Sequence, residues 1–369
     1  MTSKSNAKRA KFHEPEWVLT GFSTTLLKWF YGNKRELPWR ETKDPYKVWL
    51  SEIMLQQTRV NQAMDYYLGF IKKFPSVNSL AAAKEVEVLK MWQGLGYYSR
   101  ARNLHHAAKT VVQKFAGEFP GSFHELLQLK GVGKYTAAAI ASICFSEPTA
   151  VVDGNVMRVL SRLMGIREAM DSKDGIKKIQ SLADALLDKN NPGDFNQAMM
   201  EFGAIQCTPK NPDCGSCVFR SSCFALSNGL VDELPKKSKH TVVKDIWMDY
   251  FVLHTAQKIY LRKRNDSGIW KNMYDFPCVE STVKKNELKV LKEFFTRHSS
   301  LPNCFLKETG AEVIHILSHR KIHARFFEIE LSEKWLSKQE SIFEVEISTL
   351  KKYPVPRLIE NYLSGKKFI

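Results

Sequence analysis

Long apolar runs are missing from this sequence. No stretch of about eighteen apolar residues occurs, so a membrane-spanning helix is not expected. Residues 1–13 are polar and basic and lack an apolar segment, so no secretory signal is expected there. Internal repeats and low-complexity tracts are also lacking. The chain has 7 cysteines, and without an export signal they are expected in the reducing cytoplasm, where thiols bind metal rather than form disulfides.

Acidic residues are too few to balance the basic ones. The sequence has 55 Lys and Arg against 39 Asp and Glu, a net charge of +16, which favours a polyanionic partner. The length of 369 residues is enough for two domains. Composition and periodicity predict a basic tail at 1–16, a helical domain at 17–229, a charged linker at 230–244 and an α+β domain at 245–369.

No histidine lies among the four cysteines that cluster between Cys207 and Cys223. Cys207, Cys214, Cys217 and Cys223 are close enough in sequence to converge on one metal centre. The all-thiol set fits both a tetrahedral zinc site and an iron–sulfur cluster, and the spacing alone does not separate the two.

Two glycines and an aspartate mark a second functional region. Gly131 and Gly133 lie between two predicted helices, where a tight turn and free helical amides can bind a phosphate group. An ordinary turn between helices would look the same. Asp153 follows two apolar residues and opens a helix, which fits a simple N-cap or a carboxylate that stabilises positive charge.

The hairpin, the Val-Asp-Gly-Asn segment at 152–155 and the cysteine loop occur in an order that resembles the helix-hairpin-helix DNA glycosylases. The cysteine spacing is similar to that of their iron–sulfur branch, which implies a 4Fe-4S cluster held by the four cysteines. Residues 50–58, Leu-Ser-Glu-Ile-Met-Leu-Gln-Gln-Thr, resemble the catalytic helix of the MutY adenine DNA glycosylases. The resemblance implies a mostly α catalytic domain, built from a six-helix barrel and an iron–sulfur helical module. An α+β Nudix-like domain is expected to follow it.

The catalytic residues expected from this resemblance are Glu52, Asp153, Tyr135 and Asn155. Glu52 lies among apolar residues, so burial should raise its pKa and keep it protonated as a general acid, although a glutamate on an exposed helix face is the simpler reading. Asp153 would stabilise the positive sugar, with Tyr135 and Asn155 orienting it and the attacking water.

The resemblance also assigns contacts with DNA and substrate. The expected residues are Arg40, Gln57, Thr58, Tyr97, Gly131, Gly133, Gln197, Ser318 and His319. Tyr97 would wedge into the duplex, although core packing is the alternative reading, and Gln197 would read the exocyclic amine of adenine. Ser318 and His319 would contact 8-oxoguanine.

Several family features are missing. Endonuclease III-like enzymes carry a nucleophilic lysine where this chain has Tyr135, so Schiff-base lyase chemistry is not expected. Residues 241–369 lack the glutamate-rich Nudix hydrolase signature, so the domain should read a base rather than hydrolyse nucleotides. Lys130 replaces the usual proline of the hairpin, and Leu317 replaces the usual phenylalanine before Ser318.

These features predict a monomeric, monofunctional glycosylase that removes adenine opposite 8-oxoguanine or guanine in double-stranded DNA. Such a protein would be cytoplasmic, and nucleoid-associated in a bacterium. Two alternatives stay open at this point. One is an endonuclease III-like bifunctional glycosylase/lyase, and the other is a non-catalytic protein that binds damaged DNA.

Overall fold

The computed structural model describes residues 21–238, 243–265, 268–337, 339–366 and 368. The predicted basic tail at 1–16 lies outside this part. Contacts divide the described chain into two compact units. The first unit contains residues up to 52 and from 118 to 238, and the second contains residues 53–117 and the C-terminal part from 243 onward.

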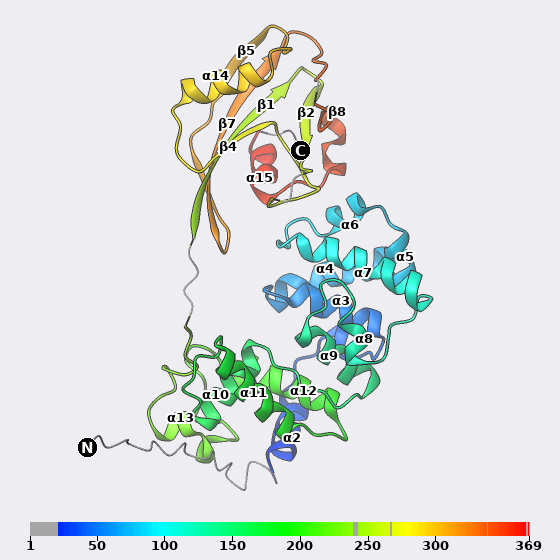
Figure 1. The fold of residues 1–369 in the computed structure, drawn as a ribbon, viewed down its shortest axis with the longest axis vertical. Coiled ribbons are helices and arrows are strands. Elements are labelled where there is room, and N and C mark those ends of the chain that lie inside the picture. The colour runs from blue at the N-terminus through cyan, green and yellow to red at the C-terminus, as the bar shows by residue number, and fades with distance from the viewer. Residues whose placement is uncertain (1–20, 239–242, 266–267, 338, 367, 369) are drawn as a thin grey trace, which may run out of the picture. The chain divides into compact units, whose positions relative to one another are not determined.

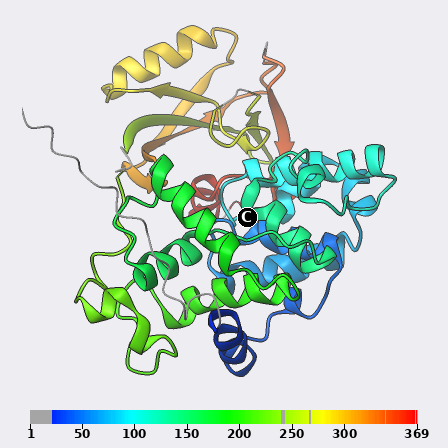
Figure 2. The ribbon, with the colours of Figure 1, turned by 60° about the horizontal axis from the view of Figure 1, so that its bottom comes forward.

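The first unit is built from helices and helical turns (Figures 1 and 2). Its elements are α2 (Phe22–Asn33), η1 (Pro38–Arg40), most of α3 (Pro45–Leu55), α8 (Phe123–Leu126), α9 (Lys134–Phe145), α10 (Gly154–Met164), α11 (Lys173–Leu186), α12 (Pro192–Glu201), η2 (Phe202–Gln206), η3 (Arg220–Ser222) and α13 (Phe224–Ser227). An apolar core of this unit lies between α2, α10, α11 and α12. Three of the clustered cysteines, Cys207, Cys217 and Cys223, pack against it, so the cysteine loop belongs to this core.

The second unit combines helices with a sheet. Its helical elements are α4 (Val60–Lys73), α5 (Val77–Ala82), α6 (Glu85–Met91), α7 (Ser99–Phe115), α14 (Glu287–Arg297), η4 (Ile347–Lys352) and α15 (Arg357–Gly365). Its strands are β1 (Lys244–His254), β2 (Lys258–Lys263), β3 (Tyr274–Asp275), β4 (Cys278–Ser281), β5 (Cys304–Thr309), β6 (Val313–Ile316), β7 (Arg320–Leu331) and β8 (Ile342–Glu346).

The C-terminal sheet has the order β3-β2-β1-β7-β5, with β4 beside β1, β6 beside β7 and β8 beside β2. Its centre is the parallel pair β1 and β7, and the other pairs are antiparallel. Successive residues of β7 point to opposite faces. Phe327 packs with Phe251 and with Phe294 of α14, whereas Phe326 stacks on Tyr362 of α15. The two helices therefore cover opposite faces of the sheet (Figure 1).

The predicted fold class is confirmed: a helical N-terminal part precedes a C-terminal part that contains a sheet. The first part of the predicted linker at 230–244, up to residue 238, makes contacts with the helical unit. Leu234 is buried and accepts a hydrogen bond from Arg162, and Ser238 is bonded to Asp171. Among the described helices, none has the length and apolar character needed to cross a membrane.

Candidate active site and cysteine centre

Glu52 lies on the buried side of α3. Its neighbours Leu50, Ile53 and Met54 are apolar and buried, and Glu52 itself is only 6% exposed. Burial raises the pKa of Glu52 to about 7, because a charged carboxylate is poorly solvated there. The predicted burial and raised pKa of Glu52 are therefore confirmed, and the alternative of an exposed helix face is wrong. The carboxyl group carries a proton in much of the population near neutral pH.

Tyr135 is the direct partner of Glu52. It lies in the first turn of α9, where its hydroxyl donates a hydrogen bond to Glu52 Oε2. This bond and the charge of Arg40 oppose the effect of burial, while repulsion from Asp153 adds to it. The sequence predicted that Tyr135 orients Asp153, but the hydroxyl is bonded to Glu52 instead. The preceding residue, Lys134, is exposed, as expected for a side chain turned about 100° around the helix.

Asp153 is the N-cap of α10. Its Oδ1 accepts from the backbone N–H of Val156 at 2.7 Å, and its Oδ2 accepts from Asn155 Nδ2 at 2.8 Å. Burial raises the pKa of Asp153, and these two hydrogen bonds oppose that effect. The approach to Asp153 is fixed by Asn196, whose Oδ1 accepts from the backbone N–H of Val151 at 3.0 Å. Asn155 thus makes the predicted contact, whereas the supporting role of Asn196 was missed.

Two arginines connect α10 to the start of the cysteine loop. Arg158 donates to Asn155 Oδ1 at 2.8 Å and to the carbonyl groups of Gly203 at 2.6 Å and Cys207 at 2.8 Å. Arg162 lies one turn later and places Nη1 3.5 Å from Cys207 Sγ. A Cβ atom on Gly203 would lie 2.5 Å from Cβ of Asn155, so this close packing requires glycine. Neither arginine was predicted from the sequence, although their separation of four residues, about one helical turn, places them on the same face of α10.

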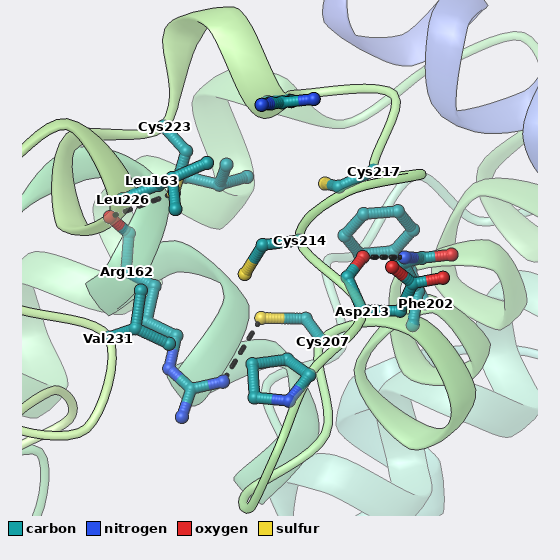
Figure 3. Close-up of a pocket in the computed structure, with 13 residues that line it drawn as sticks. Arg162, Leu163, Phe202, Cys207, Asp213, Cys214, Cys217, Cys223, Leu226 and Val231 are labelled. Carbon is teal, nitrogen blue, oxygen red and sulfur yellow. Dashed lines mark hydrogen bonds between the residues drawn. The ribbon is translucent and has the colours of Figure 1, made fainter.

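The four clustered cysteines line one pocket (Figure 3). Each is partly buried, and each has a free thiol. Asp213, the only carboxylate in the lining, is bonded to Ser216 at 2.5 Å. In the described residues, no group of three or more His, Cys, Asp or Glu side chains is placed to hold a single metal ion. The four thiols of the lining are the type of donor found in thiolate-bound metal centres, although they are not placed around a single ion.

Arg40 is engaged in a buried ion pair. Its Nη1 and Nη2 lie 2.9 and 2.7 Å from the carboxylate oxygens of Glu201, and Arg35 binds the same carboxylate. Burial would raise the pKa of Glu201, but the two arginines outweigh this effect and lower it to about 2. Gln197 lies half-buried one turn earlier on α12. The ion pair therefore fixes η1 against the helix that carries Gln197, and Glu201 was not singled out by the sequence.

Gly131 and Gly133 form the turn before α9. Gly131 has φ +85°, a conformation that favours glycine, and Gly133 is the N-cap residue of α9. Both are exposed, as is Lys130. The first turn of α9 carries no acidic residue, and Gly133 provides no side-chain cap, which suits the binding of a phosphate group at this helix end.

The second unit carries the other predicted DNA-contact residues. Tyr97 is 40% exposed and has φ +49°, and Gln57 has φ +57°. Arg100 connects the loop that contains Gln57 with the loop that contains Tyr97. Its Nη2 donates to Thr58 Oγ1 at 3.1 Å and to the carbonyl of Gly96 at 3.2 Å. Arg100 is buried and was missed, because nothing in the sequence distinguishes it from the neighbouring basic residues.

Ser318 and His319 form the tip of the β6–β7 hairpin. The turn is closed by a hydrogen bond of 2.8 Å from the Leu317 N–H to the Arg320 carbonyl. Both side chains are exposed, and Ser318 Oγ lies 3.1 Å from His319 Nδ1. The pair is therefore accessible at the end of two strands.

Comparisons with known proteins agree with these features. Residues 50–185 match the model of the HhH-GPD superfamily of base excision DNA repair proteins, and residues 249–365 match the NUDIX domain. The adenine DNA glycosylase of Mus musculus is 33% identical, with 95% of this chain and 80% of the mouse protein aligned. The enzyme of Buchnera aphidicola subsp. Schizaphis graminum is 37% identical over 74% of this chain and 80% of its own length.

Among solved structures, a thermostable thymine-DNA glycosylase is similar with a TM-score of 0.53 and 30% identity, covering 57% of this chain and 97% of its own. Endonuclease III in a non-covalent DNA complex has the same fold, with a TM-score of 0.52, 22% identity, and coverage of 59% and 99%. The family assignment rests on the sequence relatives, which span most of both chains. The chain belongs to the adenine DNA glycosylases, the MutY family of helix-hairpin-helix base excision repair proteins.

Proposed function

We propose that this DNA N-glycosylase removes adenine paired with 8-oxoguanine or guanine in duplex DNA by hydrolysing the N-glycosidic bond. The observation that carries the proposal is the buried Glu52, bonded to Tyr135 and with a pKa of about 7, in the same unit as the capped carboxyl group of Asp153. Pairs of carboxyl groups with different environments divide acid and charge-stabilising roles between them. The net charge of +16 favours binding to DNA.

The reaction needs the adenine to leave the base stack, because a base within the duplex cannot reach the buried carboxyl group of Glu52. Protonated Glu52 gives its proton to adenine N7. The electron pair of the C1′–N9 bond then leaves with the base, and positive charge spreads over C1′ and the ring oxygen. Asp153 stabilises that charge, or traps it as an ester that water later hydrolyses. Water adds its oxygen to C1′ and loses a proton, so the products are free adenine and an abasic site.

Strand cleavage by a lyase step is not part of the proposal. The position of the Schiff-base lysine is occupied by Tyr135, whose hydroxyl is bonded to Glu52. Lys134 is exposed one position earlier on α9 and so points away from that contact. The enzyme is therefore monofunctional.

Recognition of the opposite base is assigned to the tip of the β6–β7 hairpin. Ser318 and His319 offer exposed hydrogen-bonding groups there. Leu317 has no aromatic ring, so it supplies apolar contact without stacking. Discrimination between 8-oxoguanine and guanine then depends mainly on hydrogen bonds from the two polar residues.

The cysteine pocket fits a 4Fe-4S cluster, held by Cys207, Cys214, Cys217 and Cys223. The four thiols line one pocket, and Arg162 lies beside Cys207 Sγ. Its positive charge would partly balance the negative charge of the thiolates. When bound, such a cluster supplies cross-links that order the loop between residues 207 and 223. The chain itself contributes the thiolates and the hydrogen bonds from α10 that fix the start of the loop.

Metal analysis of the purified protein tests this assignment. We expect about four iron atoms and about four acid-labile sulfides per chain, as a cube ligated by four cysteines requires. Cys214→Ser should lower the iron content, whereas Cys304→Ser, which changes a cysteine of the second unit outside the cysteine loop, should not. About one zinc per chain without sulfide would contradict the cluster and indicate a tetrahedral zinc site.

The pH dependence of excision should follow the protonation of Glu52. Because its pKa is raised to about 7, the protonated acid is abundant below that pH and becomes scarcer as the pH rises above it. The single-turnover rate should therefore fall by about tenfold for each pH unit on the alkaline side. A rate that stays constant between pH 7 and 9 would show that Glu52 is not the acid.

The whole proposal is tested by incubating excess protein with a duplex that contains one adenine opposite 8-oxoguanine, with and without hot alkali. Strand breakage only after alkali is the expected result. Breakage without alkali would indicate an endonuclease III-like glycosylase/lyase. Binding without breakage under either condition would favour a non-catalytic damage-binding protein.

A further inference from the structure

Gln93 is held by the C-terminal segment of the second unit. Its Nε2 donates to Glu360 Oε1 at 2.8 Å, and its Oε1 accepts from the Val355 backbone N–H at 3.2 Å. Lys90 Nζ donates to the same oxygen at 2.9 Å and to the Tyr353 carbonyl at 3.3 Å. The amide nitrogen of Gln93 thus faces a carboxylate, which accepts, and its amide oxygen faces an N–H group and an ammonium group, which donate. Both ends of the side chain therefore have suitable partners.

The backbone of Gln93 is fixed as well. Its carbonyl accepts from Tyr66 Oη at 2.7 Å. The next residue, Gly94, has φ +95°, and a Cβ atom there would lie 2.4 Å from the same hydroxyl. Tyr98 Oη accepts from the Gly94 N–H at 3.1 Å. The close packing at Gly94 leaves no space for this residue to absorb a displacement of Gln93. A displacement of Gln93 should therefore also move the loop that follows Gly94.

That loop ends at the exposed Tyr97. The carbonyl of Gly96 accepts from Trp92 Nε1 at 3.0 Å and from Arg100 Nη2 at 3.2 Å. Tyr97 has a left-handed conformation, φ +49°, which is uncommon and strained for an aromatic residue. The surrounding hydrogen bonds hold this strained conformation, so the direction of the exposed ring depends on them.

A second contact links the C-terminal part to the other side of the same region. Arg102 Nη1, on α7, donates to the Lys271 carbonyl at 2.9 Å, and Asn272 Nδ2 donates to Glu85 Oε1 at 2.5 Å. Residues 85–102 are thus attached to the C-terminal part before and after the Tyr97 loop.

We propose that Gln93 and Glu360 are positioning residues, through which the C-terminal domain sets the conformation of the Tyr97 loop and thereby the efficiency of adenine extrusion. This inference rests on the proposed role of Tyr97 as the residue that enters the duplex. It makes the domain that contacts the opposite base a direct determinant of base extrusion, in addition to any effect on DNA affinity.

The test measures extrusion without bond cleavage. In a Glu52→Gln background, the fluorescence of 2-aminopurine placed opposite 8-oxoguanine in a duplex reports unstacking after rapid mixing. Gln93→Met keeps the side-chain volume but cannot make the three hydrogen bonds, and we expect it to slow extrusion about fivefold, as Glu360→Ala should. Glu346→Ala, which removes an exposed glutamate of the same domain, is the matched control and should leave the rate unchanged.

The same substitutions are then made together with Tyr97→Ala. If Gln93 acts through Tyr97, Gln93→Met adds no further loss in that background. An equal loss in both backgrounds, or an unchanged rate in Gln93→Met, would overturn the inference. Thermal unfolding of each variant shows whether it is folded. If Glu360→Ala is misfolded, the milder substitution Glu360→Gln takes its place. The fluorescence signal does not depend on bond cleavage. If no adenine were released in the alkali assay, that result would refute the proposed function but not the inference about Gln93.

Discussion

Glu52→Gln is expected to lower the single-turnover rate of adenine release by about 10³-fold, the loss typical for removal of a positioned general acid. Glutamine has nearly the same shape and can still accept the hydrogen bond from Tyr135, but it has no proton to give to adenine. The measurement is excision under enzyme excess, followed by alkali and gel separation. DNA affinity should be unchanged, because the substitution removes no contact with phosphate.

The stability of the same variant separates catalysis from folding. The raised pKa of Glu52 means that burial disfavours its ionised form, so the native state is destabilised as the pH rises above the ordinary pKa of a glutamate. Glutamine never ionises, and the variant should therefore unfold at an equal or higher urea concentration than the wild type at pH 8. Glu41→Gln, at an exposed glutamate, is the control and should change neither rate nor stability. Normal turnover of Glu52→Gln would refute the acid role.

The parts of the site that could be predicted from sequence are those in which adjacent residues share one short motif. The cysteine loop, the hairpin glycines and the helix that carries Glu52 are of this kind. Its neighbours at positions 50, 53 and 54 already placed Glu52 in an apolar setting, and the structure confirms that they are buried. The change from helical to alternating patterns likewise predicted the order of the two domains.

The contacts that could not be predicted join residues far apart in the chain. Arg35 and Arg40 meet Glu201 across more than 160 positions, and Tyr135 meets Glu52 across 83. A buried arginine such as Arg100 has no local pattern that separates it from a surface arginine, since most of its partners are backbone carbonyl groups. Tertiary packing decides these contacts, so sequence reasoning gave Tyr135 the wrong partner.

Asp153→Asn is expected to lower adenine release by about 10³-fold with the fold retained. Asparagine is as good an N-cap as aspartate, and its Oδ1 can still accept from the Val156 N–H, so α10 keeps its first turn. The negative charge is lost, however, and with it the stabilisation of the positive sugar in the transition state. The amide group would also face the donor group of Asn155, which must rotate away and weaken its bond to Arg158.

A serine at position 153 distinguishes the charge from the cap. Asp153→Ser keeps a capping oxygen without charge and should be as slow as the asparagine variant. Ser172→Ala removes the cap of α11, a bond of 3.0 Å to the Gly175 N–H, and should cost about 1 kcal/mol of stability without slowing excision. If both uncharged variants at 153 retained near-normal rates, Asp153 would be only a helix cap. If they are slow and stable, its charge is needed for the chemistry, because capping is preserved in both.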